Sequence, residues 1–297
     1  MRVLGIGELL FDVFPEGERL GGAPLNLCVN LARLGHEVAI LTCVGQDERG
    51  KRALAALESH GVSTRFVGRS RTLPTGIARV DLDASGSPTF ALQRPAAYDD
   101  LDATSELLDA IVAWAPRWLA FGSLAQETPS VRALTRALVG ACPDAQRLYD
   151  VNLRTPHPAV SVVDDLLGLA TAVKLNQDEA IVVAEMLGWP EVGHRAFLAQ
   201  AVSSFGLQAA CVTRGPAGSA LLLDGVYVEV AADPTTVIDT VGAGDAYSAG
   251  LVHGIDAGWP PERVARFAGR LAGLVASHRG ATPAWTIDDL RAPSDLR

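Results

Sequence analysis

Asp239-Thr-Val-Gly-Ala-Gly-Asp245, followed by Ala-Tyr-Ser-Ala-Gly-Leu-Val-His253, is the stretch on which the interpretation of this chain depends. The glycines on either side of Ala243 permit a tight turn and a close approach of the backbone to a ligand, and the small residues after Asp245 predict a helix that begins at once. The N–H groups at the start of such a helix, together with the positive end of its dipole, can bind an anion such as phosphate.

Asp245 has two interpretations at this position. A phosphate repels a neighbouring carboxylate, so the carboxylate needs a task there, such as accepting the proton of a hydroxyl that attacks the phosphorus. In the other interpretation the turn is only structural and Asp245 is the N-cap of the helix. The turn by itself leaves both open.

Composition excludes several classes of protein. A chain of 297 residues that is 48% hydrophobic and 20% charged can bury a full-sized core, as one large α/β domain or two smaller ones. Its net charge of −9, without an offsetting Lys/Arg block, argues against a nucleic-acid partner. Glu8 stands where a signal peptide needs an apolar core, and no apolar run is long enough to span a bilayer. We therefore expect a cytoplasmic protein with no membrane partner.

The cysteines predict no special chemistry. Cys28, Cys43, Cys142 and Cys211 lie far apart, mostly among apolar neighbours, and none belongs to a Cys-x-x-Cys pair. We expect buried thiols rather than a metal site or disulfides.

The first sixty residues predict two strand–helix units. The strands are expected at 3–6 and 37–44, and the helices within 21–35 and at 48–59. Pro24 suits a first helical turn, and Gly35 suits the stop at its end. Asp12 and Asn26 are either local caps or groups that bind the hydroxyls of a ligand.

Gly45-Gln-Asp-Glu-Arg-Gly50-Lys51-Arg52 differs by one residue from a Walker A phosphate loop. Arg52 stands where a Ser or Thr should hold Mg²⁺, and Asp47 and Glu48 would bring negative charge to the phosphates. We therefore interpret this segment as a loop that opens the next helix.

Residues 73–94 change to a period-two pattern, with a turn at Ala84-Ser-Gly86 between the two halves. Such a hairpin in a chain that otherwise alternates strands and helices predicts a small separate sheet, either an edge hairpin or a lid.

From residue 101 onward the chain alternates regularly. Helices are expected near 102–114, 128–141, 159–170, 177–188 and 194–205, with strands at 117–121, 147–151, 172–175 and 209–213, then a hairpin at 221–230 and a helix at 260–278. This order predicts a parallel sheet with helices on both faces, whose ligands bind beyond the carboxyl ends of the strands. Polar clusters follow four strands and together predict a binding rim: Gly122-Ser123, Asp150-Val-Asn152-Leu-Arg154, Asn176-Gln-Asp-Glu179 and Thr213-Arg-Gly215-Pro-Ala-Gly218.

With these features assembled, the chain resembles the ribokinase/PfkB carbohydrate kinase family from end to end. Gly242-Ala-Gly-Asp245 with Asp239-Thr240 is similar to the family's C-terminal signature, and Gly21-Gly22 with Asn26 and Leu31-Ala-Arg-Leu-Gly35 is similar to its N-terminal one. The resemblance implies a single domain over residues 1–297. Its fold would be a Rossmann-like, three-layer α/β core with a parallel central sheet and a small β-sheet lid formed by about 11–20 and 75–94.

The resemblance also implies an ATP-dependent sugar kinase with named roles. Asp245 would be the catalytic base, and the N–H groups of Gly242, Ala243 and Gly244 the anion hole. Asn176 and Glu179 match the Asn-x-x-Glu that positions Mg²⁺, largely through water. The nucleotide would meet Asn176, Thr213, Gly215, Gly218, Gly242 and Gly244, the sugar would meet Asp12, Gly22, Asn26 and Asp245, and K⁺ would bind near Asp239 and Gly280.

Within the family the chain looks most like fructokinases, on Gly21-Gly-Ala-Pro24-x-Asn26, Asp150-x-Asn-x-Arg154 and Phe121-Gly-Ser-Leu-Ala125. Ribokinases typically carry Lys where Ala23 stands. Arg94 and Arg154 could bind the carboxylate of 2-keto-3-deoxygluconate, or Arg94 could close on a fructose hydroxyl. Tyr98 departs from the Asp that fructokinases commonly show. The alternatives are therefore a ketodeoxygluconate kinase, a ribokinase, a nucleoside kinase and, from another class, a sugar- or nucleotide-binding protein without turnover.

A homodimer is expected through the lid. Ile77, Val80 and Leu82 alternate along one strand of the hairpin, and such an apolar face needs a cover that a second lid can provide.

Overall fold

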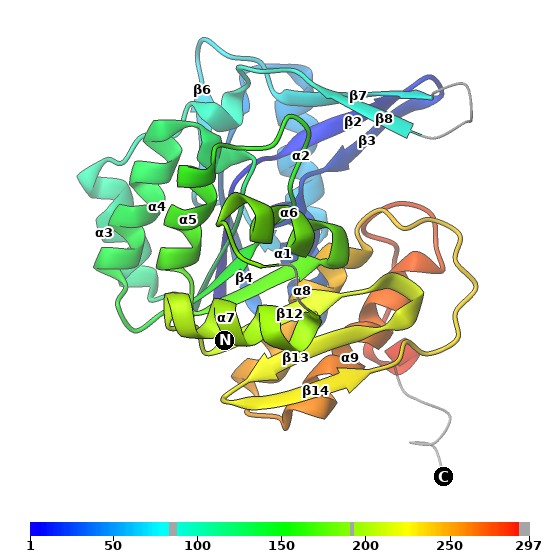
Figure 1. Ribbon diagram of the computed structural model, residues 1–297. Coiled ribbons are helices and arrows are strands. Elements are labelled where there is room, and N and C mark those ends of the chain that lie inside the picture. Colours follow the sequence, from blue (N-terminus) through cyan, green and yellow to red (C-terminus); the bar gives the residue numbers. More distant parts are fainter. Residues whose placement is uncertain (83–87, 191–192, 291–297) are drawn as a thin grey trace.

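The computed structural model describes residues 1–82, 88–190 and 193–290 (Figure 1). The turn predicted at 84–86 lies outside these residues. Ten strands form the main sheet in the order β14-β13-β12-β11-β10-β9-β1-β4-β5, with β6 beside β4. Their bounds are β1 Arg2–Ile6, β4 Glu37–Gly45, β5 Val62–Ser63, β6 Val67–Ser70, β9 Trp118–Gly122, β10 Gln146–Asp150, β11 Ala172–Asn176, β12 Ala209–Thr213, β13 Ser219–Leu223 and β14 Val226–Val230. The pairs from β12 to β5 are parallel, whereas β12–β13 and β13–β14 are antiparallel.

Helices cover both faces of this sheet (Figure 1). One face carries α3 Ser105–Trp114, α4 Pro129–Ala141, α5 Val160–Leu169, α6 Gln177–Met186 and α7 His194–Phe205. The other carries α1 Ala23–Arg33, α2 Glu48–Ser59, α8 Ala243–Asp256 and α9 Pro261–Ala276. Strand alternation builds the two cores, since Leu4 and Ile6 join the first while Val3 of the same strand joins the second. The predicted three-layer core is confirmed.

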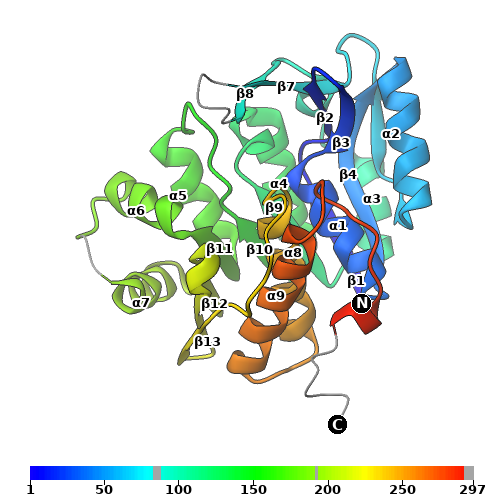
Figure 2. The ribbon, with the colours of Figure 1, turned by 90° about the vertical axis from the view of Figure 1, so that its right-hand side faces the viewer.

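A second, four-stranded sheet stands apart from the main one, as predicted (Figures 1 and 2). Its order is β3-β2-β7-β8, with β2 Leu10–Phe14, β3 Gly17–Gly21, β7 Gly76–Leu82 and β8 Pro88–Leu92. The loop that resembles a Walker A motif is hydrogen-bonded to the residue that precedes β7 of this small sheet. Asp47 Oδ1 accepts the N–H of Gly50 and so caps α2, while its Oδ2 accepts the N–H of Thr75, the residue before β7.

The predicted and observed bounds of helices and strands agree where the local sequence pattern is strong. The helices α2 and α7 and the strand β12 have the predicted bounds. Helix α3 begins three residues later than predicted, because the Thr104 hydroxyl accepts the N–H of Leu107 and caps the helix there. The short strands β5 and β6 were missed, since two and four residues carry no detectable period.

The structure tests the predictions made for the cysteines, for membrane-spanning helices and for the apolar face of the lid. All four cysteines are free and buried. Among the described residues, no helix is long and apolar enough to cross a membrane. Ile77, expected on an exposed lid face, is 6% exposed and packs in the chain's own core, so that part of the dimer argument is wrong. The side chains of Val80 and Leu82 lie outside the described part of the chain.

Candidate active site

Helix α8 begins at a turn that requires glycine. Gly242 is the N-cap with φ of 80°, in the left-handed region, and a Cβ on it would stand 2.6 Å from the backbone of Ala281. A Cβ on Gly244 would stand 3.0 Å from Nζ of Lys174. The first turn of α8 is therefore held against two other segments, and the glycines allow this close packing.

The N–H groups at this turn differ in availability. Ala243 N–H donates to the carbonyl of Thr240 at 3.2 Å. Within the described residues, the N–H groups of Gly242 and Gly244 have no hydrogen-bond partner. The expectation for Ala243 is therefore corrected: its amide holds the turn together, while the two glycine amides stay open to an anion.

Asp245 lies in the first turn of α8 but does not cap it. Its Oδ2 instead accepts a hydrogen bond of 2.8 Å from Nδ2 of Asn26, which is 219 residues away in the sequence. Burial raises the pKa of Asp245 to about 7, with the Asp150 carboxylate adding to the rise and the Asn26 bond opposing it. The structural interpretation of Asp245 as N-cap is wrong, and a carboxylate that titrates near neutrality is suited to accept a proton.

Asn26 reaches Asp245 from the first turns of helix α1. Gly22 is the N-cap of this helix with φ of 120°, and a Cβ there would stand 2.4 Å from the carbonyl oxygen of Glu8. Asn26 is 5% exposed, and its Oδ1 is buried without a hydrogen-bond partner in the described chain. An unpaired buried acceptor is costly, so this oxygen is available to a ligand hydroxyl.

Asp12 and Arg154 complete this side of the site. Within the described residues neither side chain has a hydrogen-bond partner. Burial raises the pKa of Asp12 to about 6, against the opposing charges of Arg154 and Arg19. Arg154 is exposed and also acts electrostatically on Asp245, so it lies within range of both carboxyl groups. The structure thus brings these two predicted residues together with Asn26 and Asp245.

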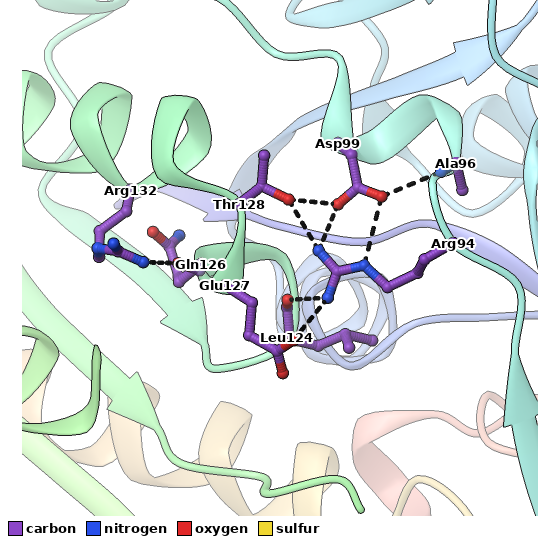
Figure 3. A network of polar contacts seen from close by, with 8 residues as sticks. All are labelled: Arg94, Ala96, Asp99, Leu124, Gln126, Glu127, Thr128 and Arg132. Atoms are coloured by element: carbon purple, nitrogen blue, oxygen red, sulfur yellow. Dashed lines mark hydrogen bonds and ion pairs between the residues drawn. The ribbon is translucent and has the colours of Figure 1, made fainter. Parts of the chain in front are cut away.

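Arg94 differs from expectation. Its five N–H donors are all used inside the chain, on both oxygens of Asp99, on the Leu124 carbonyl, and on the side chains of Glu127 and Thr128 (Figure 3). A guanidinium has no further donor to offer. Arg94 therefore ties the end of β8 to the loop after β9, which includes the 3-10 helix η2 Ala125–Glu127, and has no donor left for a sugar. Tyr98, which stands where fructokinases commonly show Asp, is buried. The neighbouring Asp99 forms an ion pair with Arg94.

Asn176 and Glu179 form a capping box at the start of α6. Asn176 Oδ1 accepts the N–H of Glu179, and Glu179 Oε2 accepts the N–H of Asn176, while Oε1 accepts the N–H of Leu153. Each carboxylate oxygen keeps capacity for a further donor or a cation. In the described chain no group of three or more His, Cys, Asp or Glu could hold a metal alone. Two oxygen-bearing side chains fit Mg²⁺, which takes most of its ligands from water and phosphates.

The neighbouring strand end carries the predicted nucleotide loop. Thr213 of β12 pairs in register with Asn176 of β11, so the two polar ends lie side by side. Gly215 and Gly218 both have positive φ, 53° and 88°, and a Cβ on Gly218 would stand 1.9 Å from the carbonyl of Val230. The loop between them is the short 3-10 helix η3 Gly215–Ala217, folded back against β14.

Asp239 joins two loops where the cation was expected. Its Oδ1 accepts the N–H of Val241 and its Oδ2 accepts the N–H of Gly280. The carboxylate therefore fixes the turn before α8 against the segment after α9.

Lys174 was not among the site residues predicted from the sequence. This residue is 5% exposed, and its Nζ lies 3.1 Å from Oδ1 of Asp150, whose Oδ2 accepts a hydrogen bond of 2.6 Å from Ser248. Burial acts to lower the pKa of Lys174, but Asp150 and the neighbouring carboxylates prevail and raise it to about 12. The signal was present, since Lys174 is the one charged residue in the strand Ala-Val-Lys-Leu-Asn176.

Comparisons with known proteins agree with this architecture. A family model described as pfkB family carbohydrate kinase matches residues 10–287. The chain is similar to a fructokinase of Klebsiella pneumoniae, 31% identical over 96% of this chain and 96% of the relative, and to one of Salmonella typhimurium, 29% identical over 88% and 86%. A crystal structure of a fructokinase with bound ATP from Xylella fastidiosa superimposes with a TM-score of 0.85 at 25% identity, covering 97% of this chain and 96% of that one. Since the match spans both sheets and the turn that carries Asp245, the chain belongs to the pfkB family of carbohydrate kinases.

Proposed function

We propose that this protein transfers the γ-phosphoryl group of ATP to a primary hydroxyl of a sugar, with fructose as the acceptor. The observation that carries the proposal is the Asp245 carboxylate, which lies at the open start of α8, 2.8 Å from the Asn26 amide, with a pKa of about 7. A general base works best when its pKa lies near the working pH. A carboxylate that stayed ionised at all working pH values would be a weaker base.

Each remaining group has a task in this reaction. Asp12 and the free Oδ1 of Asn26 accept hydrogen bonds from sugar hydroxyls and orient the reacting one toward Asp245. Asp245 takes the proton as that hydroxyl attacks. The open N–H groups of Gly242 and Gly244 stabilise the negative charge on the transferring group. Phosphoryl transfer depends on such positioning and charge neutralisation more than on covalent chemistry.

The nucleotide is assigned to the adjoining strand ends. Thr213, Gly215 and Gly218 contact its phosphates, and Asn176 and Glu179 hold Mg²⁺ through water. When bound, Mg²⁺ neutralises charge on the phosphates. The Xylella fastidiosa fructokinase that shares this fold was crystallised with ATP, which supports the nucleotide assignment.

Fructose is favoured by the motifs at both ends of the site and by the similarity to the fructokinase of Klebsiella pneumoniae. An acid sugar such as 2-keto-3-deoxygluconate is the second candidate, because Arg154 is an exposed cation without a hydrogen-bond partner in the described chain. Ribose and nucleosides remain in the panel as further members of the same reaction class.

The test is ADP release from Mg·ATP with fructose, ribose, ketodeoxygluconate, tagatose and several nucleosides, with Asp245→Asn as the blank. Fructose-dependent release that the variant abolishes supports the full proposal. Release confined to an acid or a nucleoside keeps the mechanism and overturns the acceptor. Nucleotide binding without turnover on any acceptor would instead support a binding protein.

Three further assignments belong to this proposal. The chain acts as one kinase domain whose small sheet closes as a lid over the sugar. K⁺ binds near Asp239, whose carboxylate joins the turn before α8 to the segment after α9. Replacing K⁺ by Na⁺ in the assay is then expected to lower the rate of ADP release. The protein acts in the cytoplasm as a homodimer through the lid, and a monomeric mass at micromolar concentration would refute the dimer.

A further inference from the structure

Lys174 is an unusual choice for this chain. Lysine occurs only at positions 51 and 174, whereas 23 of the 25 basic residues are arginine. Lys51 is an exposed residue of α2 paired with Glu48. Lys174 lies in a central parallel strand, with only 7% of its side chain exposed. Burying an ammonium is expensive, so the position calls for a specific partner or task.

Asp150 is the direct partner, but the ammonium has a second neighbour. A Cβ on Gly244 would stand 3.0 Å from Nζ, so the charge lies against the backbone of the residue whose N–H is open to an anion. A planar guanidinium is bulkier than an ammonium, which explains why this position holds a lysine. The contact joins β11 to the first turn of α8, elements that are 70 residues apart in sequence.

Lys174 offsets part of the negative charge gathered around this point. Its ammonium interacts electrostatically with three carboxyl groups, those of Asp150, Glu179 and Asp245. A phosphoryl group arriving at α8 adds further negative charge. Because the peptide N–H groups carry only partial charges, a full positive charge behind them strengthens their hold on an anion.

We propose that Lys174 is a positioning residue of the phosphoryl-transfer site, whose ammonium places a full positive charge behind the Gly244 amide and so stabilises the transferring phosphoryl group. The inference rests on the proposed function, since it assigns that group to the start of α8. It differs from a purely structural role, in which Lys174 only neutralises the buried Asp150.

A charge-matched pair of variants separates the two roles. Lys174→Met removes the ammonium and leaves the Asp150 carboxylate without its counter-ion, and the double variant Asp150→Asn/Lys174→Met removes both charges. Replacing a buried ion pair by neutral groups is often tolerated, so the double variant carries the test if the single variant fails to fold. Lys51→Met is the matched control, because it removes the chain's other lysine from an exposed helix.

We expect kcat of the double variant to fall by about 10- to 100-fold, somewhat less than the loss of a direct anion-hole donor, while the sugar KM changes by less than about three-fold. Lys51→Met keeps the parent kcat. A double variant with the parent kcat overturns the proposal, because neutrality at Asp150 would then be all that matters.

A second measurement needs no acceptor. Calorimetric titration with AMP-PNP and with ADP gives a ratio of affinities that reports the γ-phosphoryl group. We expect the double variant to lower the preference for AMP-PNP by about five-fold or more, and an unchanged ratio overturns the role of Lys174. If the parent protein phosphorylates no sugar, the proposed acceptor fails while this ratio still decides the role of Lys174.

Discussion

The hydrogen bond from Asn26 to Asp245 makes the pH profile the sharpest test of the site. Asn26→Leu keeps a similar volume and removes the 2.8 Å bond from Nδ2 to the Asp245 carboxylate. A hydrogen bond to a charged group is worth about 1.5–3 kcal/mol, and each pKa unit corresponds to about 1.4 kcal/mol. Since the bond favours the ionised form, its loss raises the pKa of Asp245 by about one to two units above its value of about 7.

The magnitude follows from the ionised fraction of the base. With a pKa of about 7, roughly half of Asp245 is ionised at pH 7, and in the variant about one tenth to one hundredth is. We therefore expect kcat to fall by roughly 5- to 50-fold at pH 7 and to recover by about pH 9.5. The assay is ADP release with saturating sugar between pH 5.5 and 9.5, because Asn26 also contacts the sugar and its loss raises KM. An acid limb that stays near pH 7 in Asn26→Leu would refute Asp245 as the titrating base.

Three other variants test separate features. Asp245→Asn should lower kcat by roughly 10²–10⁴-fold, and near-normal turnover would exclude Asp245 from the mechanism. Because folding raises the pKa of Asp245 from 3.8 to about 7, its ionisation lowers stability as pH rises through that range, so this variant should unfold at a higher temperature than the parent at pH 8. Arg94→Lys should lower the free energy of unfolding by roughly 2 kcal/mol or more, because the guanidinium forms its hydrogen bonds within the chain. The sugar KM should change little; a large rise in KM at unchanged stability would instead support the predicted contact of Arg94 with the sugar. His36 Nε2 lies 2.8 Å from His253 Nδ1, and burial together with the charge of His253 lowers the pKa of His36 to about 4. Folding therefore favours the neutral imidazole, and the free energy of unfolding should fall as pH drops from about 6.5 to 4. His36→Gln/His253→Gln should reduce this pH dependence of the free energy of unfolding, measured by chemical denaturation.

Local patterns explain how much of the fold was predictable. The continuous apolar run of β4 and the 3.6-residue period of α2 and α7 predicted those elements, because a strand buried on both faces and a helix buried along one stripe each leave a pattern in the residues themselves. The position where α3 begins depended on one Thr104 hydroxyl, and β5 is only two residues long, so neither left a repeat. The signatures around Gly22 and Asp245 were also recognisable from sequence. Gly22 and Gly242 have positive φ and lie against other backbone segments, so each turn requires glycine at that position.

The site was predictable as a set of residues and not as a set of contacts. Asp12, Asn26, Arg154 and Asp245 were named from sequence and do lie close together. Arg94 was named with them, but its charge gave no indication that Asp99, Glu127 and Thr128 would use every donor. Residue type states which bonds a side chain can form, whereas the partners are decided by what the fold brings within reach.

By itself the sequence determined the longer strands and helices, the two glycine turns and the family, because these depend on short segments and on the preferences of single residues. Only the tertiary structure decided that Asn26 donates a hydrogen bond to Asp245 from 219 positions away, that the Ala243 amide is used within its own turn, and that Lys174 Nζ lies against Gly244. Those contacts join separate strands and helices, so they exist only when sheet register and helix packing bring the elements together. Charge and burial then set the pKa of the base, and neither is encoded in any one segment.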